Sequence, residues 1–357
     1  MKWTIAEYNN WTNEGKPINL NVTELNISNS NVDSLTGIEN LPNLIELNIS
    51  NSNIDSLTGV EIELPNLIEL NTSNSNINSL TGIENLPNLT KLNCSFNRLT
   101  SLYGIENLFN LTELICGGNR LTSLNDIEKL LNLTELHCSD NKLISLKGIE
   151  NLVNLIKLNC SYNQMTSLNG IEKLLNLTEL DCSENKLTSL NCIKNLHKLT
   201  KLSCSRNKLT SLNGIENLFN LTELHCYHNQ LTTISDVEKL FNLTILYCSY
   251  NQLTSLNEIK NLHKLTRLYC GYNQLTSLND IKYLFDLTEL YCGCNQLTFL
   301  TVKHLNELKK LYCSYNQLTS LEGIENLNKL TYLCSKNNPL ESLNLMKNIP
   351  SNITKPS

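Results

Sequence analysis

The sequence predicts an α/β solenoid, a single curved coil of stacked repeats with a parallel β-sheet on its concave face and short 3-10 or helical returns on its convex face. Three observations predict this fold: one short phrase occurs in fifteen copies, the copies recur at a nearly constant step of 22 residues, and apolar residues keep fixed offsets within each copy. One step is 23 residues, from Leu44 to Leu67, and one is 21, from Leu287 to Leu308. The residues that open the copies are Val22, Leu44, Leu67, Leu89, Leu111, Leu133, Leu155, Leu177, Leu199, Leu221, Leu243, Leu265, Leu287, Leu308 and Leu330.

One copy, residues 89–110 (LTKLNCSFNRLTSLYGIENLFN), shows the elements in order. The stretch Leu92-Asn93-Cys94 alternates apolar and polar residues, which is typical of a short strand with one buried face. The later apolar residues recur every three positions, a spacing that suits 3-10 or other tight helical turns. These residues are Leu99, Leu102, Ile105 and Leu108. Each copy therefore predicts a strand, a turn and a short return on the opposite side.

Most of the fourteen cysteines occupy one offset of the repeat. Eleven copies have Cys there, from Cys94 to Cys313, and Cys334 is expected to fill the same position in the last copy. The first three copies have Ile27, Ile49 and Thr72 instead, which indicates a core position where Cys acts as a small hydrophobic residue. Because aligned thiols would mispair in an oxidising compartment, we expect a reducing, cytoplasmic location; a nuclear one is also compatible.

An asparagine three residues after the cysteine forms a second column. Its carboxamide can both donate and accept hydrogen bonds, so we expect it to bridge neighbouring coils where the chain leaves the strand. The first three copies have Ser30, Ser52 and Ser75, whose side chains are predicted to be too short, which would loosen that end. The asparagines are Asn97, Asn119, Asn141, Asn163, Asn185, Asn207, Asn229, Asn251, Asn273, Asn295, Asn316 and, if Cys334 is aligned, Asn337.

This pattern, L-x-x-L-x-L-x-x-N-x-L, resembles the leucine-rich repeat, and its length resembles the 22-residue class found in internalins and in a nuclear phosphatase regulator. The resemblance covers about residues 20–340. Cysteine in place of leucine, as in Leu-Asn-Cys-Ser-Phe-Asn-Arg-Leu, is also similar to repeat proteins encoded by giant viruses of amoebae. The resemblance implies the fold, and it raises the alternative that the chain is a regulatory or targeting subunit of an enzyme such as a protein phosphatase.

The ends of the chain depart from the repeat, which suggests an N-terminal cap at 1–19, a solenoid at 20–340, and a C-terminal cap remnant and tail at 341–357. An open solenoid end exposes leucines, so Trp3, Ile5, Tyr8 and Trp11 are expected to form a lid; a docking peptide for a partner is the alternative. At the other end, Leu333-Cys334-Ser335 is one residue short of the usual strand and Pro339 stands where an apolar residue is expected. The coil is predicted to close there.

Tyrosines gather on the outward positions of the late copies. Rings on adjacent strands would lie close enough to stack, and tyrosine gives large contact area at low entropic cost. Late duplication of repeats is the other explanation, although the returns at 254–264, 276–286 and 298–307 differ while the tyrosines persist. The predicted partner-binding residues are Tyr247, Tyr250, Tyr269, Tyr272, Tyr291, Tyr312 and Tyr315.

The sequence offers little for catalysis or for cofactors. It has no phosphate loop, zinc-protease helix or nucleophile elbow, and His225-Cys226-Tyr227-His228 alternates inward and outward, so its side chains would not share an ion. We therefore expect no catalytic, cofactor-binding or metal-binding residues. A net charge of -6 argues against nucleic acid, and the lack of a long apolar stretch or leader argues against a membrane or secretion.

The predicted function is a non-catalytic scaffold, a monomer that binds a protein partner of unknown identity on its concave face. Three other functions stay open: the phosphatase-type regulator, an enzyme or metal protein that uses Cys192 or Cys294, and a secreted adhesin. The adhesin would carry glycans on sequons such as Asn88-Leu89-Thr90.

Overall fold

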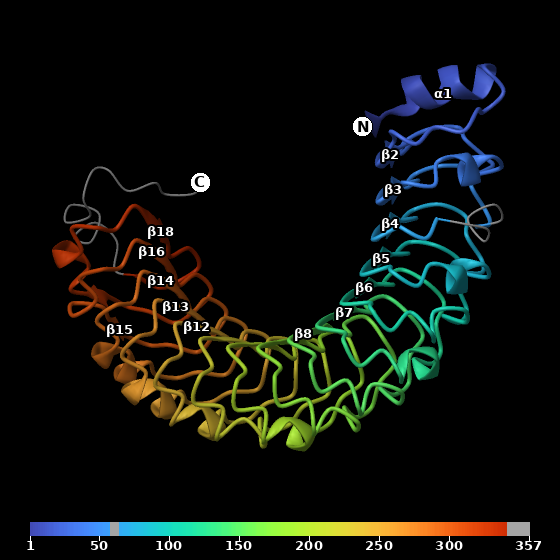
Figure 1. Ribbon diagram of the computed structural model, residues 1–357. Helices are drawn as coiled ribbons and strands as arrows, with labels where there is room; N and C mark the ends of the chain where they lie inside the picture. The colour runs from blue at the N-terminus through green and yellow to red at the C-terminus, as the bar shows by residue number, and fades with distance from the viewer. Residues whose placement is uncertain (58–63, 341–357) are drawn as a thin grey trace. The chain divides into compact units, whose positions relative to one another are not determined.

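The computed structural model describes residues 1–57 and 64–340. The chain divides into two compact units, Met1–Leu180 and Asp181–Ser357, and each is built from the predicted repeat. Every one of the fifteen copies contributes a three-residue strand, which consists of the second leucine of the copy and its two neighbours. Within each unit the strands lie on the concave side and the returns on the other (Figure 1).

In unit one, strands β1 to β8 pair in parallel and in chain order. The 23-residue step does not disturb the register, because Leu47 still pairs with Leu70. Residues 58–63, in the return of that longer copy, lie outside the described residues. The strands are β1 (Lys2–Trp3), β2 (Glu24–Asn26), β3 (Glu46–Asn48), β4 (Glu69–Asn71), β5 (Lys91–Asn93), β6 (Glu113–Ile115), β7 (Glu135–His137) and β8 (Lys157–Asn159). Strand β9 (Glu179–Asp181) contains the boundary between the units.

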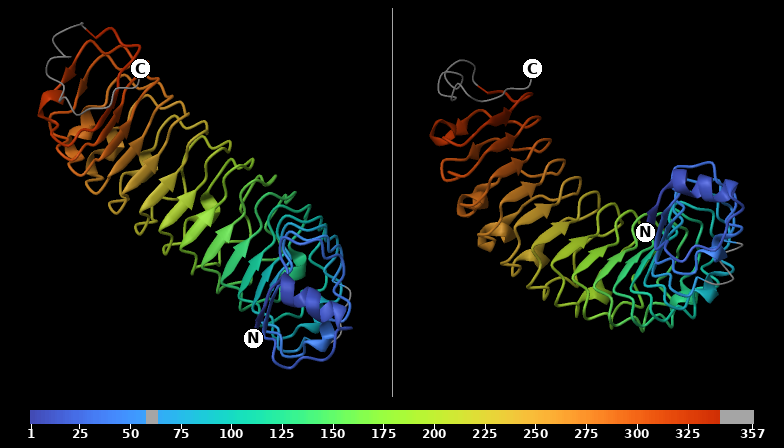
Figure 2. Two further views of the ribbon diagram at one scale, coloured as in Figure 1. Left: turned by 90° about the horizontal axis from the view of Figure 1, so that it is seen from above. Right: turned by 45° about the horizontal axis from the view of Figure 1, so that its top comes forward.

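In unit two, β10 to β14, β16 and β18 pair in parallel and in register, and their arrows lie side by side in Figure 2. A second small sheet forms on the return side, where β15 (Leu300–Thr301) pairs with β17 (Leu321–Glu322). The strands of the main row are β10 (Lys201–Ser203), β11 (Glu223–His225), β12 (Ile245–Tyr247), β13 (Arg267–Tyr269), β14 (Glu289–Tyr291), β16 (Lys310–Tyr312) and β18 (Tyr332–Cys334).

The returns follow the three-residue spacing of their apolar residues, as predicted. Eight of them in the described chain contain a 3-10 helix, and others turn at a glycine with positive φ, such as Gly214 at 111°. A side chain at Gly214 would place Cβ 2.5 Å from the Leu190 carbonyl oxygen, so this close approach requires glycine. The 21-residue copy has β15 in its return. The 3-10 helices are η1 (Ile38–Asn40), η2 (Ile83–Asn85), η3 (Asn125–Ile127), η4 (Asn191–Ile193), η5 (Ser235–Val237), η6 (Asn257–Asn261), η7 (Asn279–Tyr283) and η8 (Ile324–Asn326).

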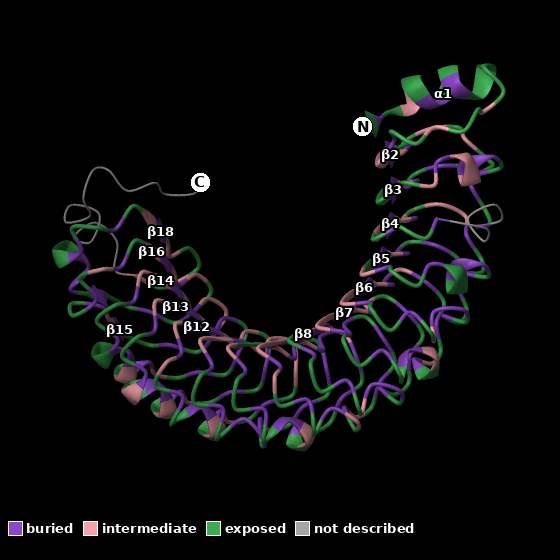
Figure 3. Ribbon diagram, viewed as in Figure 1, coloured by how far each residue is buried: buried purple, intermediate pink, exposed green. Residues whose placement is uncertain are grey.

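The core consists of columns of identical positions from successive copies, seen as buried segments in Figure 3. The leucines at the fixed offsets are buried, and each contributes roughly 2 kcal/mol of hydrophobic stabilisation. All eleven column cysteines, from Cys94 to Cys313, are fully buried, and so are Ile27, Ile49 and Thr72. The prediction that this offset is a core position is confirmed.

The asparagine column joins each copy to its neighbours, as predicted. The Nδ2 of Asn119 donates to the carbonyls of Cys94 (3.0 Å) and Cys116 (3.1 Å), while its Oδ1 accepts from the Leu99 amide at 3.0 Å. One carboxamide therefore satisfies the buried Leu99 amide and shares in the hydrogen bonding of carbonyls from two copies. The same set of bonds recurs along the column, for example at Asn251 and Asn273.

The prediction for the last copy is wrong by one residue. Tyr312 pairs with Cys334, so Cys334 takes the outward position and Ser335 follows at the core offset. Asn338, not Asn337, completes the asparagine column, because its Oδ1 accepts from the Leu318 amide and its Nδ2 donates to the Cys313 carbonyl, both at 3.0 Å. The strand is of normal length, and the next apolar position is filled by Leu340 rather than Pro339.

The prediction for the serines is also wrong in part. The hydroxyl of Ser75 reaches back across the repeat to the Ile49 carbonyl at 3.3 Å. Ser52 and Ser30 bond within their own copies, to Ile49 at 2.7 Å and to Ile27 at 2.6 Å. A serine can therefore span the gap, although with fewer bonds than a carboxamide.

A further asparagine column lies on the outer corner and was missed from the sequence. In nine copies the residue before the opening leucine is an Asn that donates to a carbonyl of the preceding coil, as Asn110 does to Pro87 at 2.9 Å. The threonine after that leucine does the same, as Thr112 does to Thr90 at 3.1 Å. Both polar residues of the Asn-Leu-Thr sequon thus have structural partners. The column members are Asn43, Asn66, Asn88, Asn110, Asn132, Asn154, Asn176, Asn220 and Asn242.

The N-terminal residues lie over the first repeat. Helix α1 (Ile5–Asn13) begins with a capping box formed by Thr4 and Glu7. It buries Tyr8 and Trp11, and the ring of Trp3 packs 5.9 Å from that of Trp11. Strand β1 extends the row through its pairing with β2. No helix in the described part of the chain is long and apolar enough to cross a bilayer.

The buried thiols should resist modification in the native protein. Burial raises the pKa of Cys94, Cys138 and Cys248 to about 12, so little reactive thiolate forms at neutral pH. Of fourteen thiols, only the partly exposed Cys192, Cys294 and Cys334 should react quickly with a disulfide reagent, whereas all should react in guanidinium. Fast loss of the column thiols in native protein would contradict the packing.

Replacing Asn251 with Ala should destabilise the coil strongly. The change leaves the Leu231 amide without its side-chain acceptor and removes one of the two carboxamides that donate to the Cys226 carbonyl, at a cost of about 2 kcal/mol. Faster hydrogen exchange at the Leu231 amide would report the loss locally. Asn220→Ala is the matched control, since Asn220 donates one exposed bond to the His197 carbonyl and should cost about 1 kcal/mol. Equal costs for the two variants would refute the bridging role.

Candidate binding surface

Two slots of each copy present side chains on the strand side. The first is the outward strand position between the leucine and the cysteine, occupied by Tyr247, Tyr269, Tyr291 and Tyr312 in unit two. The second lies two residues after the cysteine, where every copy adopts positive φ, and we term it the left-handed slot. Its residues are Asn29, Asn51, Asn74, Phe96, Gly118, Asp140, Tyr162, Glu184, Arg206, His228, Tyr250, Tyr272, Cys294, Tyr315 and Asn337.

The left-handed slot suits Asn and Gly, and it disfavours most other residues by roughly 1 kcal/mol or more. The early copies follow that preference with Asn29, Asn51 and Asn74 at φ of 52–54°. Tyr250 and Tyr272 adopt φ of 55° and 54° without such an advantage. Local backbone energetics therefore do not account for tyrosine at these positions.

The outward strand slot forms a continuous stack that we term the long ladder. Adjacent ring centroids lie 3.9–4.5 Å apart along it, and four of its five pairs are stacked with planes within 29° of parallel. The stacking predicted from the tyrosine positions is confirmed. Tyr332 joins from the neighbouring strand position, since it pairs with Lys310 rather than Tyr312. The long ladder consists of His225, Tyr247, Tyr269, Tyr291, Tyr312 and Tyr332.

The left-handed slot forms a second stack, the short ladder of His228, Tyr250 and Tyr272. Their ring centroids are 4.0 and 4.1 Å apart, with planes about 10° from parallel. Cys294 occupies the next position, so Tyr315, the remaining predicted residue, stands beyond the stack. Tyr250, Tyr272 and Tyr315 are 41, 51 and 60% exposed, and the tyrosines of the long ladder are half-buried.

Stacking determines which parts of the rings a ligand can reach. At centroid spacings near 4 Å the rings touch face to face, so no further ring fits between them. What remains exposed along both ladders is the ring edges, which carry positive partial charge, and the hydroxyl groups.

A carboxylate anchors the middle of the long ladder. The Tyr269 hydroxyl donates to Glu289 at 2.7 Å, and Lys310 lies 3.0 Å from the same carboxylate. Burial, with the bond to Glu289, raises the pKa of Tyr269 above its usual range. Burial also acts to raise the pKa of Glu289, but the bonds from Tyr269 and Lys310 outweigh it and lower the pKa. The pair is therefore a neutral phenol bonded to a carboxylate at neutral pH.

A histidine begins each ladder, and sequence reasoning treated both only as surface residues. His225 stacks on Tyr247 at 4.5 Å and His228 on Tyr250 at 4.0 Å. Burial lowers the pKa of both imidazoles. Their slots, which are the same as those of the tyrosines, were the signal that could have placed them in the stacks. Within residues 1–57 and 64–340, no three His, Cys, Asp or Glu side chains are grouped to hold a metal ion.

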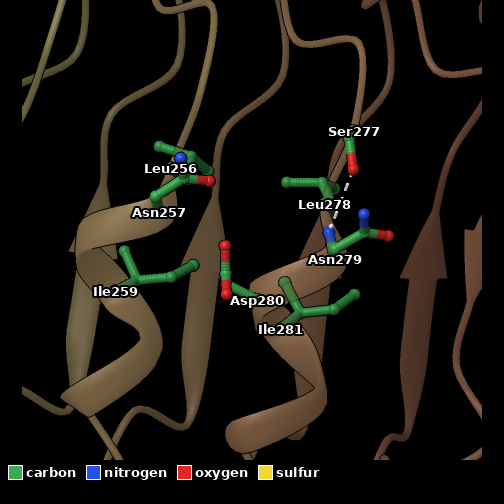
Figure 4. Close-up of a pocket in the computed structure, with 8 residues that line it drawn as sticks. All are labelled: Leu256, Asn257, Ile259, Ser277, Leu278, Asn279, Asp280 and Ile281. Carbon is green, nitrogen blue, oxygen red and sulfur yellow. Dashed lines mark hydrogen bonds between the residues drawn. The ribbon is translucent and has the colours of Figure 1, made fainter.

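Two cavities in the described part of unit two lie on the return side. The smaller, between η6 and η7, holds about 10 Å³, enough for about one water, with Asp280 between the two helices (Figure 4). The larger, of about 310 Å³, is lined by Lys282, Phe299, Lys303 and His304, and its Glu322 pairs with Lys303 at 3.2 Å. Neither lining contains Cys192 or Cys294, the two cysteines that the enzyme hypothesis would use.

The comparisons with known proteins agree with this repeat architecture. A family model described as Leucine Rich repeats (2 copies) matches residues 153–196, 197–239, 241–283 and 306–348. A functional domain of InlJ from Listeria monocytogenes, which includes a cysteine ladder, is 34% identical with a TM-score of 0.71, and the match covers 82% of this chain and 68% of that one. The chain belongs to the leucine-rich repeat family.

Two more solved leucine-rich repeat structures are similar over most of their length. The protein LIC12759 from Leptospira interrogans is 29% identical with a TM-score of 0.88 and complete coverage of both chains. The internalin InlF from Listeria monocytogenes is 28% identical with a TM-score of 0.75, covering 80% of this chain and 85% of that one. No curated protein sequence matches significantly. Leucine-rich repeat proteins serve in general as non-enzymatic protein-interaction scaffolds.

The imidazoles of the ladders should titrate below the ordinary histidine range. In an NMR titration, His225 and His228 should show midpoints below 6.5, because burial disfavours the charged form. Between the native and unfolded midpoints the native protein binds fewer protons, so their contribution to the free energy of unfolding rises with pH and is complete above about 6.5. Tyr247→Asn should raise the midpoint of His225, because it removes the ring that buries this imidazole. The midpoint of His228 should stay where it is, below 6.5. An unchanged His225 midpoint would contradict burial by the stack.

Proposed function

We propose that this leucine-rich repeat protein is a non-catalytic scaffold that binds a protein partner on the concave side of unit two. The two aromatic ladders are the observation that carries the proposal. They form a preorganised surface in which stacking already restrains the rings, so binding loses little side-chain entropy. Tyrosines are also enriched where protein interfaces bury most of their area.

The left-handed slot supports a functional origin for the tyrosines. Tyr250 and Tyr272 stand where the first three copies have asparagine, at a cost to the backbone. The returns that follow them, 254–264 and 276–286, share seven of eleven residues, so their sequences do not separate selection from late duplication, and the backbone cost alone favours a functional origin. A residue that is locally unfavourable and yet repeated is what a recognition surface would retain.

The test exchanges ladder tyrosines for the residue that the chain itself uses elsewhere. Tyr269→Asn, Tyr291→Asn and Tyr312→Asn together restore the early-copy pattern of Asn48 and Asn71 at the outward strand slot. The core and the asparagine column are untouched, so the thermal midpoint should change little. Capture of the partner from the native host, quantified by mass spectrometry, should fall by at least tenfold.

The matched control changes three exposed aromatic residues on the return side of the same unit. Phe219, Phe241 and Phe285 are about half exposed, and the equivalent positions of other copies hold His197 and His263. The triple change of these phenylalanines to His should leave capture intact. If the tyrosine variant folds and still captures the partner at the original level, the ladders are not the binding surface.

Two further proposals concern the rest of the chain. We propose residues 1–19 as a cap, because Tyr8 and Trp11 are buried over the first repeat. We also propose a reducing cytoplasmic location, because eleven thiols aligned in one column would mispair in an oxidising compartment. The regulator alternative differs from a general scaffold in one readout. Phosphatase activity would accompany the captured partner and disappear in the tyrosine variant.

A further inference from the structure

The exposed chemistry of the ladders restricts the kind of partner that can bind. Sugars, prolines and cationic groups bind aromatic residues through ring faces. In both ladders those faces are occupied by neighbouring rings at 3.9–4.5 Å. A ligand that lies along the ladders meets ring edges and hydroxyls, which attract acceptor groups and negative charge.

The polar residues beside the ladders favour the same chemistry. A column of exposed glutamines follows the asparagine column, and their amides can donate to a ligand. These are Gln230, Gln252, Gln274, Gln296 and Gln317. Each lies one residue past its column asparagine and two residues past the left-handed slot.

Charge on this part of the concave side is positive, although the whole chain carries -6. Over residues 223–338, which hold both ladders, the strand side has Arg267, Lys310 and Lys336 against Glu223 and one further carboxylate, Glu289. That carboxylate is already bonded to Tyr269 and Lys310. In contrast, a groove of about 260 Å³ on the strand side of unit one is lined by Glu46, Glu69 and Glu113 with only Lys91.

We propose that the two ladders bind an extended acidic polypeptide segment, with Asp and Glu side chains directed at the ring edges and at Arg267 and Lys336. This rests on the proposed function and specifies its partner class. An extended segment of about six residues, at ~3.3 Å per residue, spans the roughly 20 Å length of the long ladder. Nucleic acid is disfavoured, because polyanion binding requires more cations than these and the chain is acidic overall.

The experiment measures binding of fluorescent synthetic probes to the full chain by anisotropy. The probes are a Glu/Ser peptide of about eight residues, a Lys/Ser peptide and a proline-rich peptide of equal length, and a short oligothymidine. Only the Glu/Ser peptide should bind, and its affinity should fall as salt rises from 50 to 300 mM, on the order expected for a few screened charges.

Paired variants test the site. Arg267→Gln with Lys336→Gln should weaken the Glu/Ser peptide about tenfold, and so should the triple Tyr→Asn variant. Lys239→Gln with Lys260→Gln removes the same charge from exposed return positions of unit two and should leave affinity within about twofold. Salt-dependent binding that is lost in both test variants and kept in the control supports the proposal.

Other outcomes overturn it. Equal binding of the Lys/Ser or proline-rich peptide, binding of oligothymidine alone, or no binding of the Glu/Ser peptide would each reject an acidic segment. Failure here is distinguishable from failure of the scaffold proposal. If host partner capture depends on the tyrosines but not on Arg267 and Lys336, the surface binds a partner of another class.

Discussion

The carboxamide that bridges neighbouring copies is the interaction on which the rest of the structure depends. The strand of each copy is only three residues long, and the backbone bonds between copies continue past it, as from the Cys94 amide to the Ile115 carbonyl and from the Phe96 amide to the Gly117 carbonyl, both at 2.8 Å. Where the chain leaves the strand, buried carbonyls and amides need partners that a turn alone does not supply. Asn119 and its equivalents give three or more bonds each, to two copies at once. The leucines then pack in columns because the backbone is already aligned.

The thiol column and the aromatic ladders follow from that alignment. Once copies stack in register, any residue at a given offset lies directly beside its equivalent in the next copy. Inward offsets become continuous apolar columns, and Cys fits there as a small hydrophobic side chain. Outward offsets become rows on the surface, and rings placed in one row stack. The surface is thus as regular as the core beneath it.

The sequence predicted those features that repeat many times, because a side chain's environment is then given by its offset alone. The strands, the buried Cys94 to Cys313 and the bridging asparagines all belong to this class. Prediction failed where one copy departs from the pattern. Cys334 was aligned by residue type, but register is set by the leucines, so Ser335 entered the core offset and Asn338 the bridging one. The outer asparagines were missed because their bonds join turns whose spacing only the folded coil defines.

The left-handed slot has a consequence for how this surface can change. Its backbone conformation is the same left-handed one in all fifteen copies, whether the residue is Asn, Gly, His, Cys, charged or aromatic. Substitutions at this position can therefore change the chemistry of the strand-side surface while the backbone conformation stays the same. Randomising the slot together with the outward strand position would give a combinatorial library on one framework, in which each residue other than Asn or Gly at the slot costs roughly 1 kcal/mol of stability.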